Sequence, residues 1–248
     1  MKVLLGYTGL VGSNLDHEYF DILLNRSNID AFIQRDLEVQ ELWIAAGDAR
    51  KWFALKEPTI FKKDSVSLTK KIIQLNPKKA ILFSTIDVYD GEHSVNENNL
   101  PRPIHPYGKI QLEREIVLKN QLEELSIVRL PGLFGSNLRK NFIFDLLNRR
   151  TDYIESLNGF SQFQYFDLNL LHSRVLTLNA DVTNLVTEPV SVSDIYSCYT
   201  RVYKEKYEFK GKSSVMYNVM TSQTASGYFH TKDDVKQRLY AFFKQSKT

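Results

Sequence analysis

The stretch Met1-Lys-Val-Leu-Leu-Gly-Tyr-Thr-Gly-Leu-Val-Gly-Ser-Asn-Leu15 decides the fold of this 248-residue chain. Its first residues, Lys2 to Leu5, form a short apolar run that predicts a buried strand, and Gly6, Gly9 and Gly12 follow. The first glycine permits a tight turn, the second lets backbone N–H groups approach a pyrophosphate, and the third lets a helix pack closely. The N-terminus of that helix would add partial positive charge for the phosphates. The stretch therefore predicts a dinucleotide site built on the first strand and the first helix.

The composition is that of an ordinary globular protein. Hydrophobic residues make up 43% and charged residues 25% of the chain, and the formal net charge is +3. The positive charges form no basic stripe with interleaved aromatic residues, so we expect no nucleic-acid partner, and the histidines lack metal-ligand spacing. The single cysteine, Cys198, excludes an internal disulfide framework. With no signal peptide and no apolar run of membrane length, we expect a soluble cytoplasmic protein without a membrane partner.

Strands and helices alternate along the first half of the chain. Apolar residues at helical spacing predict a helix over 13–25, and a second short strand is expected over 29–33. Only about eight residues then precede the next strand, Leu42 to Ala46, whereas a full βαβ crossover needs about ten to twelve. Two further strands and the helix between them are expected over 80–83, 127–130 and 107–120. The alternation predicts an α/β fold with a doubly wound, mostly parallel sheet, Rossmann-like but abbreviated after the second strand.

Beyond residue 135 the pattern loosens, and two helices stand out. One is expected to be capped at Ser193, and the other to begin at Thr231 with two aspartates in its first turn. We therefore expect a dinucleotide-binding core over 1–135 and a small C-terminal substrate-binding subdomain over 136–248, with segments that return to the core.

Five motifs follow one another in a familiar order. The glycine triplet precedes Ser84-Thr-Ile-Asp-Val-Tyr89 and Pro106-Tyr-Gly-Lys109, and then come Arg129-Leu-Pro-Gly-Leu-Phe-Gly135 and Pro189-Val-Ser-Val-Ser-Asp194. Each motif alone is a weak signal, but five in order on suitable elements are much more specific. Together they resemble the extended short-chain dehydrogenase/reductases, the nucleotide-sugar epimerase, dehydratase and reductase group. The resemblance covers most of the chain.

The resemblance implies roles for particular residues. Thr85 would hydrogen-bond the reacting oxygen, and Tyr107 would move the hydroxyl proton while a cofactor transfers hydride. The family has a lysine four residues after the tyrosine, where this chain has Gln111, which can bind a ribose hydroxyl but carries no charge. Lys109 does not replace that lysine, because two residues along a helix place it about 200° round. The candidate catalytic residues are Thr85, Tyr107 and Gln111.

The resemblance also implies a bound NADP or NAD. Arg35 lies just past the expected second strand, where an arginine favours the 2′-phosphate of NADP, although it is equally consistent with a solvated surface residue. The candidate cofactor-binding residues are Gly6, Gly9, Leu10, Val11, Gly12, Arg35, Ala45, Ala46, Gly47 and Gln111. The candidate substrate-binding residues are Asp87, Pro131 and Gly132.

Three functions are consistent with these motifs. The leading hypothesis is an NAD(P)-dependent epimerase, reductase or dehydratase acting on a nucleotide-linked sugar. The second, motivated by Gln111, is a catalytically impaired family member that acts as a nucleotide-binding or scaffolding protein. The third is a reductase of a non-nucleotide carbonyl compound. By analogy with the family, we expect a homodimer formed through the helix that contains Tyr107.

Overall fold

The computed structural model describes residues 1–89 and 93–247 and divides the chain into two compact units. Unit 1 comprises Met1–Asp90, Asn99–Leu130 and Leu170–Thr183. Unit 2 comprises Gly91–Asn98, Pro131–Asn169 and Asn184–Thr248. The units therefore interleave along the chain, and the segment 170–183 returns to unit 1 from the second half. Among the described residues, no helix is both long and apolar enough to cross a membrane.

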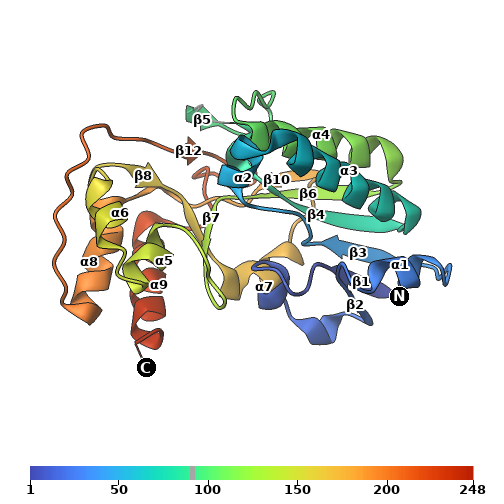
Figure 1. The fold of residues 1–248 in the computed structure, drawn as a ribbon, viewed down its shortest axis with the longest axis horizontal. Coiled ribbons are helices and arrows are strands. Elements are labelled where there is room, and N and C mark those ends of the chain that lie inside the picture. The colour runs from blue at the N-terminus through green and yellow to red at the C-terminus, as the bar shows by residue number, and fades with distance from the viewer. Residues whose placement is uncertain (90–92, 248) are drawn as a thin grey trace. The chain divides into compact units, whose positions relative to one another are not determined.

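Unit 1 is built on a six-stranded sheet with the order β10-β6-β4-β3-β1-β2 (Figure 1). The strands are β1 (Lys2–Leu5), β2 (Ile22–Leu24), β3 (Glu41–Ile44), β4 (Lys79–Thr85), β6 (Leu125–Leu130) and β10 (Val182–Asn184). The pairs β1–β2, β1–β3, β3–β4 and β4–β6 are parallel. Leu4, Leu42 and Trp43 in its central strands are completely buried, as a sheet covered on both faces requires. The predicted α/β fold with a mostly parallel sheet is confirmed.

The first two crossovers differ from the predicted ones. Between β1 and β2 the chain forms two short 3₁₀ turns, η1 (Gly12–Asn14) and η2 (His17–Tyr19), so the helix predicted over 13–25 is wrong. The strand predicted over 29–33 is also wrong, because helix α1 (Ile29–Ile33) occupies it. The physical reason is strand pairing: Ile22 and Leu23, whose spacing suggested a helix face, pair with β1 as its parallel neighbours.

The strand order explains why the sheet is abbreviated. Dinucleotide-binding sheets commonly have the order 3-2-1-4-5-6, with two strands beyond the first. In the described part of this chain only β2 lies on that side of β1, and the next strand, β3, lies on the other side. The chain therefore changes direction across the sheet at β1. Such a switch point is where α/β proteins bind ligands, outside the carboxyl ends of the strands.

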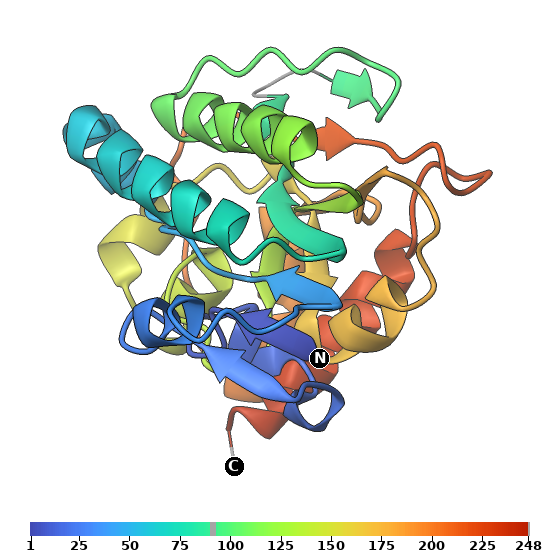
Figure 2. The same ribbon diagram turned by 90° about the vertical axis from the view of Figure 1, so that its right-hand side faces the viewer.

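Two long helices cover one face of this sheet. α3 (Pro58–Gln74) follows the short α2 (Lys51–Lys56), and α4 (Pro106–Gln121) lies beside α3 (Figure 2). Both long helices begin with proline at the first position, where its missing N–H costs nothing. The buried side of α4 carries charged as well as apolar residues, and these are Tyr107, Gly108, Ile110, Gln111, Arg114, Glu115 and Leu118. The remaining helical turns of unit 1 are η3 (Ile86–Val88) and α7 (Leu171–Val175).

The described residues of unit 2 form short strands and four helices around an apolar core. The helices are α5 (Phe142–Leu147), α6 (Thr151–Ser156), α8 (Val192–Tyr203) and α9 (Lys232–Gln245), with the turn η4 (Leu168–Leu170). The strands are β5 (His93–Val95), β7 (Gly132–Phe134), β8 (Gln162–Phe163), β9 (Tyr165–Asp167), β11 (Val190–Ser191) and β12 (Asn218–Val219). They pair as β7–β9, β8–β11 and β5–β12.

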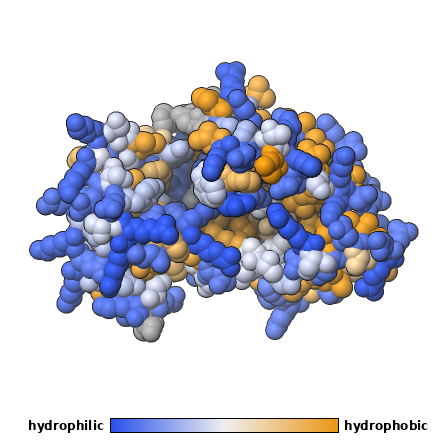
Figure 3. Space-filling view, viewed as in Figure 1, coloured by the Kyte–Doolittle hydropathy of each residue, from blue (hydrophilic) through white to orange (hydrophobic). Residues whose placement is uncertain are grey.

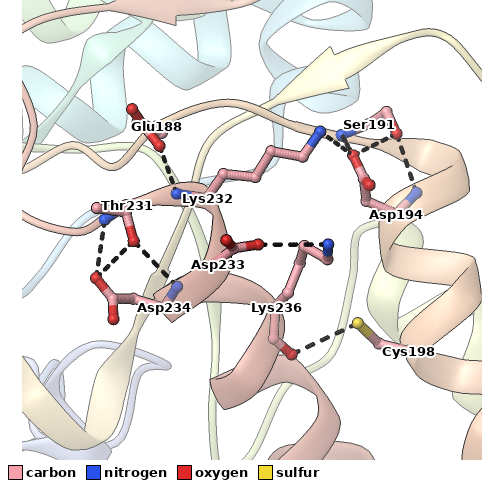
Figure 4. A network of polar contacts seen from close by, with 9 residues as sticks. All are labelled: Glu188, Ser191, Asp194, Cys198, Thr231, Lys232, Asp233, Asp234 and Lys236. Carbon is pink, nitrogen blue, oxygen red and sulfur yellow. Dashed lines mark hydrogen bonds and ion pairs between the residues drawn. The ribbon is translucent and has the colours of Figure 1, made fainter.

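Capping boxes fix the starts of α8 and α9 (Figure 4). The cap of α8 is Ser191, paired with Asp194, so the predicted cap at Ser193 is wrong by two residues. The predicted start of the last helix at Thr231 is confirmed, and Asp234 completes its box. Lys232 of α9 joins the two helices through an ion pair with Asp194, with Nζ 2.7 Å from Oδ2.

Candidate active site

A cavity of about 600 Å³ opens at the carboxyl ends of β1, β2 and β3, within unit 1. Its wall contains residues of the three segments that follow these strands, and α3 and α4 contribute further side chains. The volume lies in the range of cavities that hold small molecules and cofactors. The position is the one that the switch in strand order at β1 requires.

The glycine loop is held by close backbone contacts. Gly6 has φ +96°, and a Cβ there would lie 2.7 Å from the backbone of Ala45. A Cβ on Gly12 would lie 2.2 Å from the carbonyl oxygen of Gly6, so Gly12 packs against the loop itself and not beneath a long helix. Gly6 and Gly9 line the cavity, whereas Leu10, Val11 and Gly12 are not among its lining residues. The expected helix dipole is absent from this part of the described chain, since only the three-residue turn η1 follows.

The end of β3 forms the opposite wall. Ala45, Ala46 and Gly47 line the cavity, and so does Gln111 of α4. Gly47 has φ +140°, and a Cβ on it would lie 2.7 Å from Nη1 of Arg114. That same Nη1 donates a hydrogen bond to the carbonyl oxygen of Ala46 at 2.8 Å. Four of the predicted cofactor residues therefore meet here, together with an arginine that the sequence did not single out.

Thr85 and Tyr107 come together where β4 ends and α4 begins. Gly108 makes this possible, since a Cβ on it would lie 2.3 Å from the carbonyl oxygen of Asp87. Both side chains are buried, each 8% exposed. Burial raises the pKa of the Tyr107 phenol, and the Asp87 carboxylate raises it further. The Arg114 guanidinium and a hydrogen bond with Thr85 lower that pKa. The phenol therefore lies among groups that can hold or move its proton.

Asp87 links this pair to the surface. Thr85 donates from Oγ1 to Oδ2 of Asp87 at 2.8 Å and accepts a hydrogen bond from the Asp87 amide at 3.1 Å. Lys51 of α2 completes the chain, with Nζ 2.6 Å from Oδ1. Asp87 thus orients the threonine hydroxyl that the family resemblance assigns to the reacting oxygen.

Arg35 was named as a cofactor residue because it was expected to follow the second strand, and that expected position is wrong. Arg35 follows the helix α1 and not a strand, and it is not among the residues that line the cavity. The turn after the true second strand contains Asn25, Arg26 and Ser27, all of which line the cavity. Arg26 is exposed there, as a group that meets a ligand phosphate would be. The sequence did not indicate Arg26 because the second strand was predicted too late in the chain.

A buried ion pair lies behind the site. Arg129 of β6 and Glu115 of α4 are 5% and 2% exposed, with Nη2 2.6 Å from Oε2. Ser84 donates a hydrogen bond to Glu115, and Arg129 donates from Nη1 to the Tyr89 hydroxyl at 2.6 Å. The network ties β4, β6 and α4 together next to Thr85. Ser84, Tyr89 and Arg129 belong to the predicted motifs, but Glu115 does not, and its pairing with Arg129 is a tertiary contact that no motif indicates.

Comparison with known proteins agrees with this fold. Residues 73–157 match the family model of the RmlD substrate binding domain. The UDP-glucose 4-epimerase of Thermotoga maritima, solved with UDP-glucose, has a TM-score of 0.76 at 17% identity, over 100% of this chain and 99% of that one. MoeE5 in complex with UDP-glucuronic acid and NAD has a TM-score of 0.79 at 18% identity, over 100% and 99%. RMD from Pseudomonas aeruginosa, complexed with NADPH, has a TM-score of 0.78 at 14% identity, over 100% of both chains.

This chain has the extended short-chain dehydrogenase/reductase fold. The resemblance read from the five motifs is thereby confirmed, and no curated protein matches the sequence. The residues at the cavity fit the nicotinamide dinucleotide of an extended short-chain dehydrogenase/reductase. Gly6 and Gly9 leave backbone open to a ligand, and Nε and Nη2 of the buried Arg114 have no partner in 1–89 and 93–247. Pro131 and Gly132 belong to unit 2, and their role in substrate binding stays a prediction.

Proposed function

We propose that this protein is an NAD(P)-dependent enzyme that epimerises, reduces or dehydrates a nucleotide-linked sugar. The observation that carries the proposal is the buried pair of Thr85 and Tyr107, with the partly buried Asp87 bound to Thr85, where β4 ends and α4 begins. Tyr107 lies one helical turn from the cavity-lining Gln111. The UDP-sugars, NAD and NADPH in the complexes of the similar proteins support the substrate class and the cofactor.

Proton transfer is assigned to the protein and hydride transfer to the cofactor. A bound nicotinamide supplies hydride transfer at a sugar carbon. Tyr107 takes the proton of the adjacent hydroxyl when that carbon is oxidised and returns it when the carbonyl is reduced. Thr85 holds the same oxygen by a hydrogen bond, and Gln111 binds a ribose hydroxyl of the cofactor. A positioned proton donor of this kind typically contributes about 10²–10⁴ in rate.

The two rival functions make different predictions. A scaffolding protein does not need the series of contacts from Lys51 through Asp87 to Thr85. The presence of these contacts supports an enzyme. A reductase of a non-nucleotide carbonyl compound would use the same residues on a different substrate.

The test is cofactor titration followed by a substrate panel. NADH and NADPH are added to the protein and binding is followed by nucleotide fluorescence, after which turnover is measured with UDP-sugars, other nucleotide sugars and simple carbonyl compounds. We expect binding of a cofactor and turnover of at least one nucleotide sugar. Turnover of simple carbonyls alone would favour the third function, and cofactor binding without any turnover would favour the scaffold.

Arg26 is proposed to select NADP over NAD. It lines the cavity in the turn after β2, where no carboxylate is present to accept the ribose hydroxyls of NAD. We expect Arg26→Ala to weaken NADPH binding at least about tenfold and to leave NADH binding within about twofold, since one charged hydrogen bond contributes about 1.5–3 kcal/mol. Arg35→Ala is the matched control. Equal losses for both nucleotides in Arg26→Ala would contradict the assignment.

A homodimer through α3 and α4 is the proposed assembly. The two helices expose Val66, Ile116 and Val117, which are 42–52% exposed, beside a groove of about 400 Å³. Figure 3 shows hydrophobic surface among hydrophilic side chains where these helices lie. We expect Val117→Glu to convert a dimer to a monomer in analytical ultracentrifugation, because a charge there is costly to bury. If the wild-type protein were monomeric at about 100 μM, the proposed homodimer would be contradicted.

A further inference from the structure

Arg114 is a buried charge whose hydrogen-bonding capacity is mostly unused. Arg114 is 4% exposed, and its Nη1 donates a hydrogen bond to the carbonyl oxygen of Ala46 at 2.8 Å. Nε and Nη2 have no hydrogen-bond partner within the described ranges 1–89 and 93–247. The next residue, Glu115, accepts hydrogen bonds from Arg129 on both of its carboxylate oxygens. Such an unpaired buried cation needs an anionic or electron-rich partner.

Arg114 lies on the same side of α4 as Tyr107, and its side chain lines the cavity. The two residues are seven apart on α4, which places them about 20° apart around the helix. Long helical side chains lean toward the helix N-terminus, so the guanidinium extends in the direction of the tyrosine. Arg114 lines the cavity beside Phe61, and the ring centroid of Phe61 lies 6.0 Å from that of Tyr107. Arg114 and Phe61 therefore line the cavity, and the Tyr107 ring packs against Phe61 next to it.

We propose that Arg114 is the positioning residue that supplies Tyr107 with the positive charge that Gln111 lacks. This inference rests on the proposed function for its catalytic meaning, but the interaction itself does not require bound substrate. Arg114 lies one turn beyond Gln111, and its longer side chain reaches back across that turn. The charge stabilises the phenolate form of Tyr107, which is the form that accepts the hydroxyl proton of the substrate.

The other charges around the phenol make this contribution necessary. Burial, Asp87 of η3 and Asp48 after β3 all raise the pKa of Tyr107 and so disfavour the phenolate. Arg114 is the cation that acts against them, together with the Thr85 hydrogen bond. Burial lowers the pKa of Arg114 to about 10, which still leaves it charged at neutral pH, and Tyr107 raises that pKa. Lys51 of α2 is paired with Asp87, with Nζ 2.6 Å from Oδ1.

The experiment measures the phenol directly, without cofactor. A fluorinated tyrosine, whose phenol is more acidic and so titrates in an accessible range, replaces Tyr107, and its ionisation is followed by ¹⁹F NMR. We expect Arg114→Met to raise the pKa of this phenol by at least about one unit, a tenfold loss of phenolate. The double variant Arg114→Met/Gln111→Lys should restore the parent value within about half a unit. Lys109→Met on the far side of α4 should leave the pKa unchanged.

The outcomes separate this inference from the proposed function. An unchanged phenol pKa in Arg114→Met, or in Arg114→Gln if the methionine variant does not fold, overturns the inference even if the wild-type protein turns over sugars. A raised pKa that the double variant restores supports it even if no substrate is found. When turnover is measurable, the rise of the sugar-oxidation rate with pH should move to higher pH in Arg114→Met by the same amount, and this shift should vanish in the double variant.

Discussion

Tyr107→Phe is expected to lower the turnover of the nucleotide sugar by about a thousandfold while cofactor binding stays within about twofold. The substitution removes only the phenol oxygen, and the ring keeps its packing against Phe61. Proton transfer then has no donor or acceptor at the reacting hydroxyl. The measurement is kcat and the cofactor Kd for both proteins. Because Tyr107 does not line the cavity, we expect kcat to fall while the cofactor Kd stays nearly constant.

The matched control for this variant is Tyr19→Phe. Tyr19 also lies in unit 1, and its hydroxyl donates to Glu41 at 3.3 Å, but it is not among the cavity-lining residues. We expect kcat within about twofold of wild type, since no group at the reacting oxygen is removed. If Tyr107→Phe kept more than about a tenth of wild-type turnover, the tyrosine would not be the proton carrier.

Arg129→Met is expected to lower the free energy of unfolding by about 3–5 kcal/mol. Glu115 would then remain buried without its cation and with only the Ser84 hydrogen bond to compensate its charge. Urea denaturation, followed by circular dichroism, measures the change. The double variant Arg129→Met/Glu115→Leu should recover most of the loss, because an apolar pair of similar size avoids the desolvation cost. A single-variant loss below about 1 kcal/mol would show that the pair is not buried as described.

The core of the fold was predictable because its signals are local. The glycine loop, the apolar strands and the tyrosine after Pro106 each follow from neighbouring residues, and β1, β3, β4 and β6 lie within a few residues of their predicted bounds. The crossovers after β1 were not predictable in this way. Ile22 and Leu23 satisfy a helical period as well as a strand, and pairing with β1 decided between them. Tertiary contacts therefore override the local pattern here.

The misplaced second strand also hid one candidate site residue, Arg26, and a tertiary contact hid a second candidate, Arg114. Arg26 lies twenty residues after Gly6, the spacing at which ribose recognition occurs, so a correctly placed second strand would have indicated it. Arg114 is different, because its proposed role depends on its neighbour Glu115 being paired with another arginine, Arg129. Nothing in the sequence states that Glu115 pairs with Arg129, so the unpaired state of Arg114 becomes visible only in the folded chain.

The central claim is that the cavity at the ends of β1, β2 and β3 holds a nicotinamide dinucleotide, and titration of wild type and Gly9→Val with NADPH and NADH tests it most directly. A Cβ at Gly9 meets only ordinary contacts, the nearest being 3.4 Å from the Gly6 carbonyl oxygen, and Gly9 lines the cavity, so we expect valine there to occupy ligand space. We predict a Kd of about 1–100 μM for at least one cofactor with wild type and at least a tenfold weaker one for the variant. Failure of wild type to bind either cofactor at about 1 mM, or equal binding by the two proteins, would contradict the claim.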